Sequence, residues 1–214
     1  RYARSKGLLV IGDIKRGDIS STASAYAAHL GGAQIGDHIE ETWIEDAVTL
    51  NPYMGSDGIR PFLDICAGGD KGIFLLVKTS NPSSSEMQDL LLADGRRVYE
   101  AAGQLVETWG AEAMGSGGYS NVGAVVGATH KEEGTRLRSQ MPHTFFLVPG
   151  YGAQGGTAED IAGFFDKNGV GAVVNSSRGI TAAYKKDASF SDWEYAKAAR
   201  AAAIRMRDDL RRVL

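Results

Sequence analysis

The stretch Gly7-Leu8-Leu9-Val10-Ile11-Gly12-Asp13-Ile14-Lys15-Arg16-Gly17-Asp18 joins a run of apolar residues to a cluster of charged ones. The apolar part predicts a strand of a parallel sheet that is covered on both faces. Because side chains alternate along a strand, Asp13 and Lys15 are expected to project to the same side as neighbours. Charged residues at the carboxyl ends of parallel strands are typical of α/β active sites. The alternative is a purely structural Asp–Lys ion pair.

The same combination of short apolar runs and helical patterns continues along the chain. The six predicted strands are residues 7–14, 47–50, 72–77, 122–127, 144–148 and 171–174. The predicted helices are residues 20–30, 58–66, 85–109, 131–140, 158–168 and a long one from 191 onward. Strands that alternate with helices predict right-handed βα units and a parallel sheet.

Polar or glycine-rich residues follow each predicted strand. Candidate functional groups at the ends of six strands favour a (β/α)₈ TIM barrel, because the loops of that fold converge on one face. A doubly wound open sheet would gather its ligand groups at one switch point. Six βα units do not close an eight-stranded barrel, so we expect the first two units to be missing from this numbering. No linker divides the chain, which predicts a single domain over residues 1–214.

Composition excludes several classes of function. The net charge of −3 argues against a nucleic-acid partner, and the arginines near the end alternate with acids as on the solvated face of a helix. The single cysteine, Cys66, excludes an internal disulfide. We found no apolar run of membrane-spanning length and no signal-peptide pattern at the start, so we expect a cytoplasmic protein without a membrane partner. The four histidines lack the spacing of a zinc site.

Two segments late in the chain are suited to an anion. Pro149-Gly150-Tyr151-Gly152-Ala153-Gln154-Gly155-Gly156-Thr157 has four glycines, which let backbone amides approach a phosphate. Arg178 follows the next strand and offers a guanidinium for bidentate contacts. Loops after the last two strands of a barrel commonly bind phosphate. Neither segment has dinucleotide or P-loop spacing.

Several motifs resemble one family. Residues 13–19 followed by Thr22 are similar to the D-x-K-x-x-D-I-x-x-T signature of orotidine 5'-phosphate decarboxylase. This motif is shared with sugar-phosphate decarboxylases of the same barrel superfamily, while the later segments are more specific. Those segments are NPYMG from residue 51, TSNPSS from residue 79, VGAVVGATH from residue 122 and PGYGAQGGT from residue 149, and they resemble the bacterial subfamily with long inserts.

The resemblance implies a role for each matching residue. Lys15 would be the proton donor, flanked by the carboxylates of Asp13 and Asp18. Ser80 would bind the pyrimidine amide edge and Gln154 would bridge base and phosphate. The phosphate would be held by Arg178 and the region of Gly155 and Gly156.

The resemblance also implies a homodimer and a substrate. Asp18 and Thr22 would reach into the pocket of the neighbouring subunit. The substrate would be orotidine 5'-phosphate, converted to UMP and CO₂ in pyrimidine biosynthesis without a metal or organic cofactor. The family's aspartate after strand one and lysine after strand two have no counterpart, in agreement with the two missing units.

Two other hypotheses remain open at the level of sequence. One is a magnesium-dependent sugar-phosphate lyase or synthase that uses Asp13 and Asp18 as metal ligands. The other is a fragment that binds phosphate without catalysis.

Overall fold

The chain folds around one curled parallel sheet, seen in a computed structural model that describes residues 1–41, 43 and 45–214. The strands are ordered β1-β4-β5-β6-β7-β8, and every neighbouring pair is parallel. Their bounds are Ile11–Arg16 (β1), Ala47–Leu50 (β4), Gly72–Lys78 (β5), Val122–Val126 (β6), Phe146–Val148 (β7) and Ala172–Val174 (β8). All six predicted strands are therefore confirmed.

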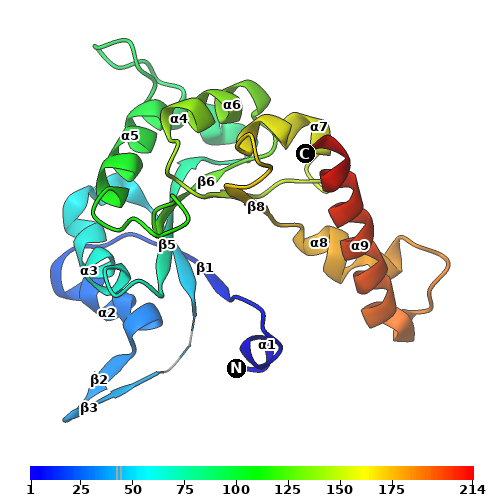
Figure 1. Cartoon of the computed structure of the whole chain (residues 1–214), viewed down its shortest axis with the longest axis horizontal. Helices are drawn as coiled ribbons and strands as arrows, with labels where there is room; N and C mark the ends of the chain where they lie inside the picture. Colours follow the sequence, from blue (N-terminus) through cyan, green and yellow to red (C-terminus); the bar gives the residue numbers. More distant parts are fainter. Residues whose placement is uncertain (42, 44) are drawn as a thin grey trace.

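Helices cover the outer side of the sheet (Figure 1). The α-helices are Tyr2–Ser5 (α1), Ser20–Gly31 (α2), Ser56–Cys66 (α3), Ser85–Gln88 (α4), Val98–Gly110 (α5), Lys131–Gln140 (α6), Ala158–Ile161 (α7), Ser177–Thr181 (α8) and Tyr195–Val213 (α9). Short 3₁₀ turns are Pro52–Met54 (η1), Pro82–Ser84 (η2), Ala162–Phe164 (η3), Ala183–Lys185 (η4) and Asp192–Glu194 (η5). Helix follows strand throughout the sheet, which confirms the predicted α/β barrel architecture.

In the described part of the chain the sheet is an open arc, a half-barrel. Strands β1 and β8 are its two edges, and each pairs with one neighbour. The core between sheet and helices is continuous, running from Ala27 in α2 to Phe164 in η3.

The first strand departs from the expected one. It begins at Ile11 rather than at residue 7, and the side chains of Leu8 and Leu9 are 61% and 83% exposed. The prediction of a strand covered on both faces was therefore wrong for these residues. The physical reason is that β1 is an edge strand, so no described neighbour covers the side opposite β4.

The predicted helix over residues 85–109 is two helices. Helix α4 ends at Gln88 and α5 begins at Val98. Between them, Gly95 adopts a φ of 88°, and the Asp94 carboxylate accepts a hydrogen bond from the Arg96 amide. This Asp-Gly turn reverses the chain, because glycine alone enters the left-handed region without cost.

Two further elements differ from expectation. The predicted helix at 158–168 ends its α-helical part at Ile161, since the following 3₁₀ turn buries Phe164 in the core. A small hairpin was also missed, Ala33–Ile35 (β2) with His38–Glu40 (β3), joined by Gly36 and Asp37. A two-residue Gly-Asp link is a recognised hairpin signal, so the sequence did contain it.

The one cysteine allows a test of the packing. Cys66 ends α3 and is 1% exposed, and its burial, with a smaller contribution from Asp70, raises the pKa of the thiol to about 12 from 9.0. We expect thiol reagents to label it at pH 8 only after unfolding. The unfolded chain loses this proton near pH 9 and the folded chain near pH 12, so stability falls as pH rises through that window. Thermal unfolding of wild type and Cys66→Ala across this pH range measures the loss of stability. Rapid labelling of the native protein by thiol reagents would contradict the burial of Cys66.

Candidate active site

A cavity of about 850 Å³ opens at the carboxyl ends of the strands. Its floor is apolar and is made by Ile11, Leu76, Val125 and Leu147, from β1, β5, β6 and β7. Its polar walls come from the loops that follow the strands. This is the arrangement that the strand-end pattern predicted.

Five of the predicted site residues line this one cavity. They are Asp13, Lys15, Ser80, Gln154 and Arg178, and they come from segments up to 165 residues apart in the sequence. The Lys15 Nζ atom lies 2.5 Å from Asp13 Oδ2, which confirms that these two side chains are neighbours. Because both are about half exposed, solvent screening makes the pair worth little to stability by itself. A binding or catalytic role fits its position better.

The backbone around Lys15 is unusual. Lys15 has a φ of 48°, in the left-handed region that residues with a side chain seldom enter. Such conformations cost of order 1–3 kcal/mol and are concentrated at functional sites. The Lys15 amide donates to Thr49 Oγ1 over 3.0 Å, and the Thr49 hydroxyl donates to Asp13 Oδ1 over 2.9 Å. Thr49, in β4, was not among the predicted site residues.

The glycine-rich loop after β7 folds back on itself. Gly150, Gly152 and Gly155 all have positive φ, and the Gly152 amide donates to Gly156 O over 2.8 Å. A Cβ at Gly150 would lie 2.9 Å from Gln154 Oε1 and 3.2 Å from Ser80 Cβ. The side chains of Ser80 and Gln154 therefore both lie close to Gly150, where a residue with a Cβ would crowd them.

The last helix holds this loop. The Tyr151 hydroxyl donates to Asp209 Oδ2 of α9 over 2.6 Å. Burial, and secondarily this hydrogen bond, raises the pKa of Tyr151 to about 12, so the hydroxyl remains a donor at neutral pH. The partners are 58 residues apart, and no local pattern in the sequence indicates the contact.

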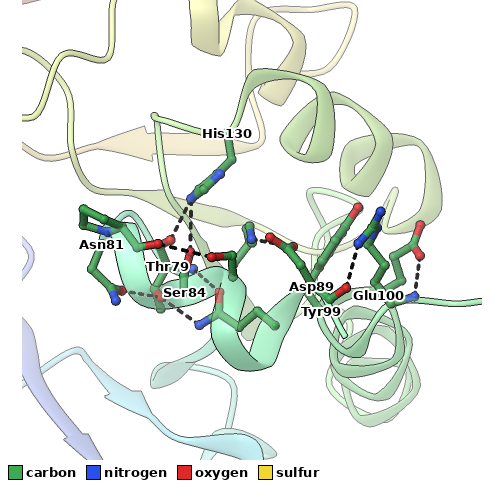
Figure 2. A network of polar contacts seen from close by, with 12 residues as sticks. Thr79, Asn81, Ser84, Asp89, Tyr99, Glu100 and His130 are labelled. Carbon is green, nitrogen blue, oxygen red and sulfur yellow. Dashed lines mark hydrogen bonds and ion pairs between the residues drawn. The ribbon is translucent and has the colours of Figure 1, made fainter. Parts of the chain in front are cut away.

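A polar network supports the segment that carries Ser80. Lys78, the last residue of β5, is fully buried and lies 2.7 Å from Asp89 Oδ1 and 5.4 Å from the Tyr99 ring centroid. Figure 2 shows His130 above Thr79, and its Nε2 lies 2.9 Å from Thr79 O. Gln88 accepts from the Thr79 amide and donates to its hydroxyl.

Lys78 was missed although the sequence contained its signal. It is a charged residue at the end of an apolar run, the pattern that singled out Asp13 and Lys15. Gly127 lies against the segment that carries Ser80, since a Cβ on Gly127 would lie 2.8 Å from the Ser80 backbone. Ser80 is thus fixed from two sides.

Four predicted residues lie outside the main cavity. Asp18 lines a smaller cavity of about 260 Å³, which adjoins the first through Lys15. Thr22 is exposed on α2, and Gly155 and Gly156 belong to the loop; these three line neither cavity. The structure therefore does not bring Asp18 and Thr22 to the predicted substrate groups of the same chain.

This separation bears on the metal hypothesis. A shared ion would need Asp13 and Asp18 to face one point. Instead the two oxygens of Asp13 contact Lys15 Nζ and the Thr49 hydroxyl, and Asp18 Oδ1 accepts from the Ile19 amide in the smaller cavity. The pair is not arranged as a set of metal ligands.

Comparison with known proteins decides the family. A sequence model of the orotidine 5'-phosphate decarboxylase/HUMPS family matches residues 1–192. The chain belongs to the orotidine 5'-phosphate decarboxylase family. Within it, the orotidine 5'-phosphate decarboxylase of Clostridium perfringens strain SM101 is 45% identical over 213 residues, which are 100% of this chain and 70% of that protein. The orotidine 5'-phosphate decarboxylase of Rhodopirellula baltica is 46% identical over 216 residues, which are 98% of this chain and 70% of that protein.

Solved structures of decarboxylases share the fold. The OMP decarboxylase of Leishmania donovani superposes with a TM-score of 0.73 at 35% identity, covering 97% of this chain and 69% of that one. The resemblance deduced from the motifs is thereby confirmed. Separately, no helix in the described residues is long and apolar enough to cross a lipid bilayer.

Proposed function

We propose that this protein converts orotidine 5'-phosphate to UMP and CO₂ with Lys15 as the proton donor. The observation that carries the proposal is one cavity with the Lys15–Asp13 pair on one wall and Arg178 and the glycine-rich loop among the others. A nucleotide has a reacting base at one end and a phosphate at the other, so it needs such a site. The family membership supplies the reaction.

The reaction explains why an ammonium group is required. When the bond between C6 and the carboxylate breaks, its electron pair stays in a ring sp² orbital that no adjacent carbonyl can delocalise. The Lys15 ammonium stabilises that charge and then transfers a proton to C6, and it recovers the proton from solvent. Asp13 Oδ2 lies 2.5 Å from the Lys15 Nζ atom, and this contact holds the ammonium on one wall of the cavity.

Lysine alone cannot supply the acceleration. Slow reactions need up to about 23 kcal/mol of transition-state stabilisation or more, whereas a positioned general acid contributes about 10²–10⁴-fold. Contacts to the phosphate must contribute binding energy that is expressed in the transition state. We assign these contacts to Arg178 and the loop over residues 149–157, with Ser80 and Gln154 on the base.

The proposal is tested by following the loss of substrate absorbance together with UMP formation. We expect turnover that continues unchanged in excess EDTA, since no step of the scheme uses a metal. A sugar-phosphate lyase dependent on magnesium would instead lose activity in EDTA and would leave orotidine 5'-phosphate unchanged. Absence of UMP formation would contradict the proposed function.

We further propose a homodimer whose sites contain residues of both subunits, with Asp18 and Thr22 acting in the neighbouring site. Exposed apolar side chains beside Asp18 support an interface there, because Ile19, Tyr53 and Met54 are 41%, 74% and 44% exposed. The single continuous core supports treating residues 1–214 as one domain.

Mixing inactive variants tests the shared site. We expect Lys15→Ala and Asp18→Asn to be inactive separately. After unfolding and refolding together, half of the dimers are mixed and each holds one intact site, so about a quarter of the wild-type activity should return. Restoration should be absent when the two substitutions are placed in one chain and mixed with Lys15→Ala. No recovery in the first mixture would show that Asp18 acts within its own subunit.

A further inference from the structure

The hydroxyl of Thr49 joins the two ends of the Asp13–Lys15 pair. Thr49 is fully buried in β4. Its oxygen accepts the Lys15 amide hydrogen over 3.0 Å, and its own hydrogen is donated to Asp13 Oδ1 over 2.9 Å. One hydroxyl therefore contacts the backbone of the proposed proton donor and the side chain of the carboxylate beside it.

The strand pairing shows why a hydroxyl is needed at this point. Gly12 pairs with Val48 and Arg16 pairs with Leu50, so three residues of β1 stand opposite Thr49 alone. Strand β1 bulges over these three residues, and the regular ladder is interrupted there. The Lys15 amide would lack a partner in β4 without the Thr49 side chain, since it donates to that hydroxyl.

The bulge contains Lys15 in an unusual backbone conformation. Lys15 has a φ of 48° and lines the main cavity as well as the smaller one. A residue persists in this conformation only where its surroundings fix it. The hydrogen bond from its amide to Thr49 is such a constraint.

We propose that Thr49 is a positioning residue for decarboxylation, which holds the Lys15 ammonium and the Asp13 carboxylate in their reactive orientation. This inference rests on the proposed function of the same cavity. Thr49 lines neither cavity and acts through its two partners. A displacement of about 1 Å at a reacting group costs about 100-fold in rate, so the hydroxyl matters for turnover more than for affinity.

Three variants separate positioning from packing. Thr49→Val keeps the shape of the side chain and removes the hydroxyl, whereas Thr49→Ser keeps the hydroxyl and removes the methyl group. Thr144→Val is the matched control, because Thr144 is also buried and its hydroxyl donates to the carboxylate of Glu107, in a position that lines neither cavity.

We expect Thr49→Val to lower kcat for orotidine 5'-phosphate about 10- to 100-fold, with KM and the dissociation constant of UMP within about twofold of wild type. Thr49→Ser should stay within about threefold of wild type in kcat, and Thr144→Val should leave kcat unchanged. Equal kcat for Thr49→Val and wild type would overturn the proposal. So would equal losses in Thr49→Val and Thr49→Ser, since the methyl group would then be the cause.

Amide hydrogen exchange of Lys15 provides a readout that does not depend on activity. The amide should exchange slowly in wild type and Thr49→Ser and at least about tenfold faster in Thr49→Val, because only the valine variant lacks the acceptor. If wild type shows this protection but forms no UMP, the proposed function fails while the geometry stands. If exchange is the same in all three proteins, the hydroxyl does not hold the bulge and the inference fails.

Discussion

Replacing Lys15 with alanine should lower kcat for UMP formation about 10⁴-fold while UMP still binds. The size follows from the two tasks of the ammonium, since general acid catalysis and electrostatic stabilisation each contribute about 10²-fold or more. Binding should persist because Arg178, Ser80 and Gln154 line other parts of the same cavity. The measurements are the absorbance assay and calorimetric titration with UMP.

The control for Lys15→Ala is Lys167→Ala, which removes an exposed lysine from the turn that precedes β8. That variant should keep wild-type kcat. Turnover by Lys15→Ala within about tenfold of wild type would rule out Lys15 as the proton donor. Loss of UMP binding in the same variant would show instead that Lys15 mainly holds the ligand.

Replacing Arg178 with alanine should lower kcat/KM for orotidine 5'-phosphate about 100- to 10,000-fold. Two hydrogen bonds to a charged phosphate are worth about 1.5–3 kcal/mol each. Orotidine, which lacks the phosphate, should be converted equally slowly by wild type and Arg178→Ala. Steady-state kinetics with both substrates therefore isolate the contact between Arg178 and the phosphate.

Arg178→Lys is the graded control, because it keeps the charge and loses the planar fork. Its kcat/KM should fall between those of wild type and Arg178→Ala. An equal proportional loss for orotidine and its phosphate would contradict a phosphate role. In that case the guanidinium acts elsewhere in the cavity.

The elements were predicted well where local chemistry determines them. The parallel strands follow from apolar runs, and α6 matches its expected bounds of 131–140 because a polar segment with two glutamates and two arginines stands between two strands. The single helix over 85–109 was wrong because the turn at Asp94 and Gly95 separates α4 from α5. Exposure of Leu8 and Leu9 depends on which strands flank β1, and the apolar pattern alone does not carry that information.

The site residues show the same contrast between local signals and long-range contacts. Asp13, Lys15 and Arg178 were found because charged groups at strand ends are few. Thr49 was missed because a threonine inside the strand run Ala47–Leu50 is an ordinary β-former, and its importance arises only from the bulge opposite it. Tyr151 and Asp209 were missed because their contact depends on where α9 packs.

The location of Lys15 relative to a bound nucleotide is the most direct measurement. A crystal structure with UMP should place the phosphate against Arg178 and the glycine-rich loop, with the base against Ser80 and Gln154. Atom C6 should then lie about 3–3.5 Å from Lys15 Nζ, the separation of a reactive pair. A UMP molecule with C6 turned away from Lys15, or with its phosphate remote from Arg178, would contradict the proposed chemistry.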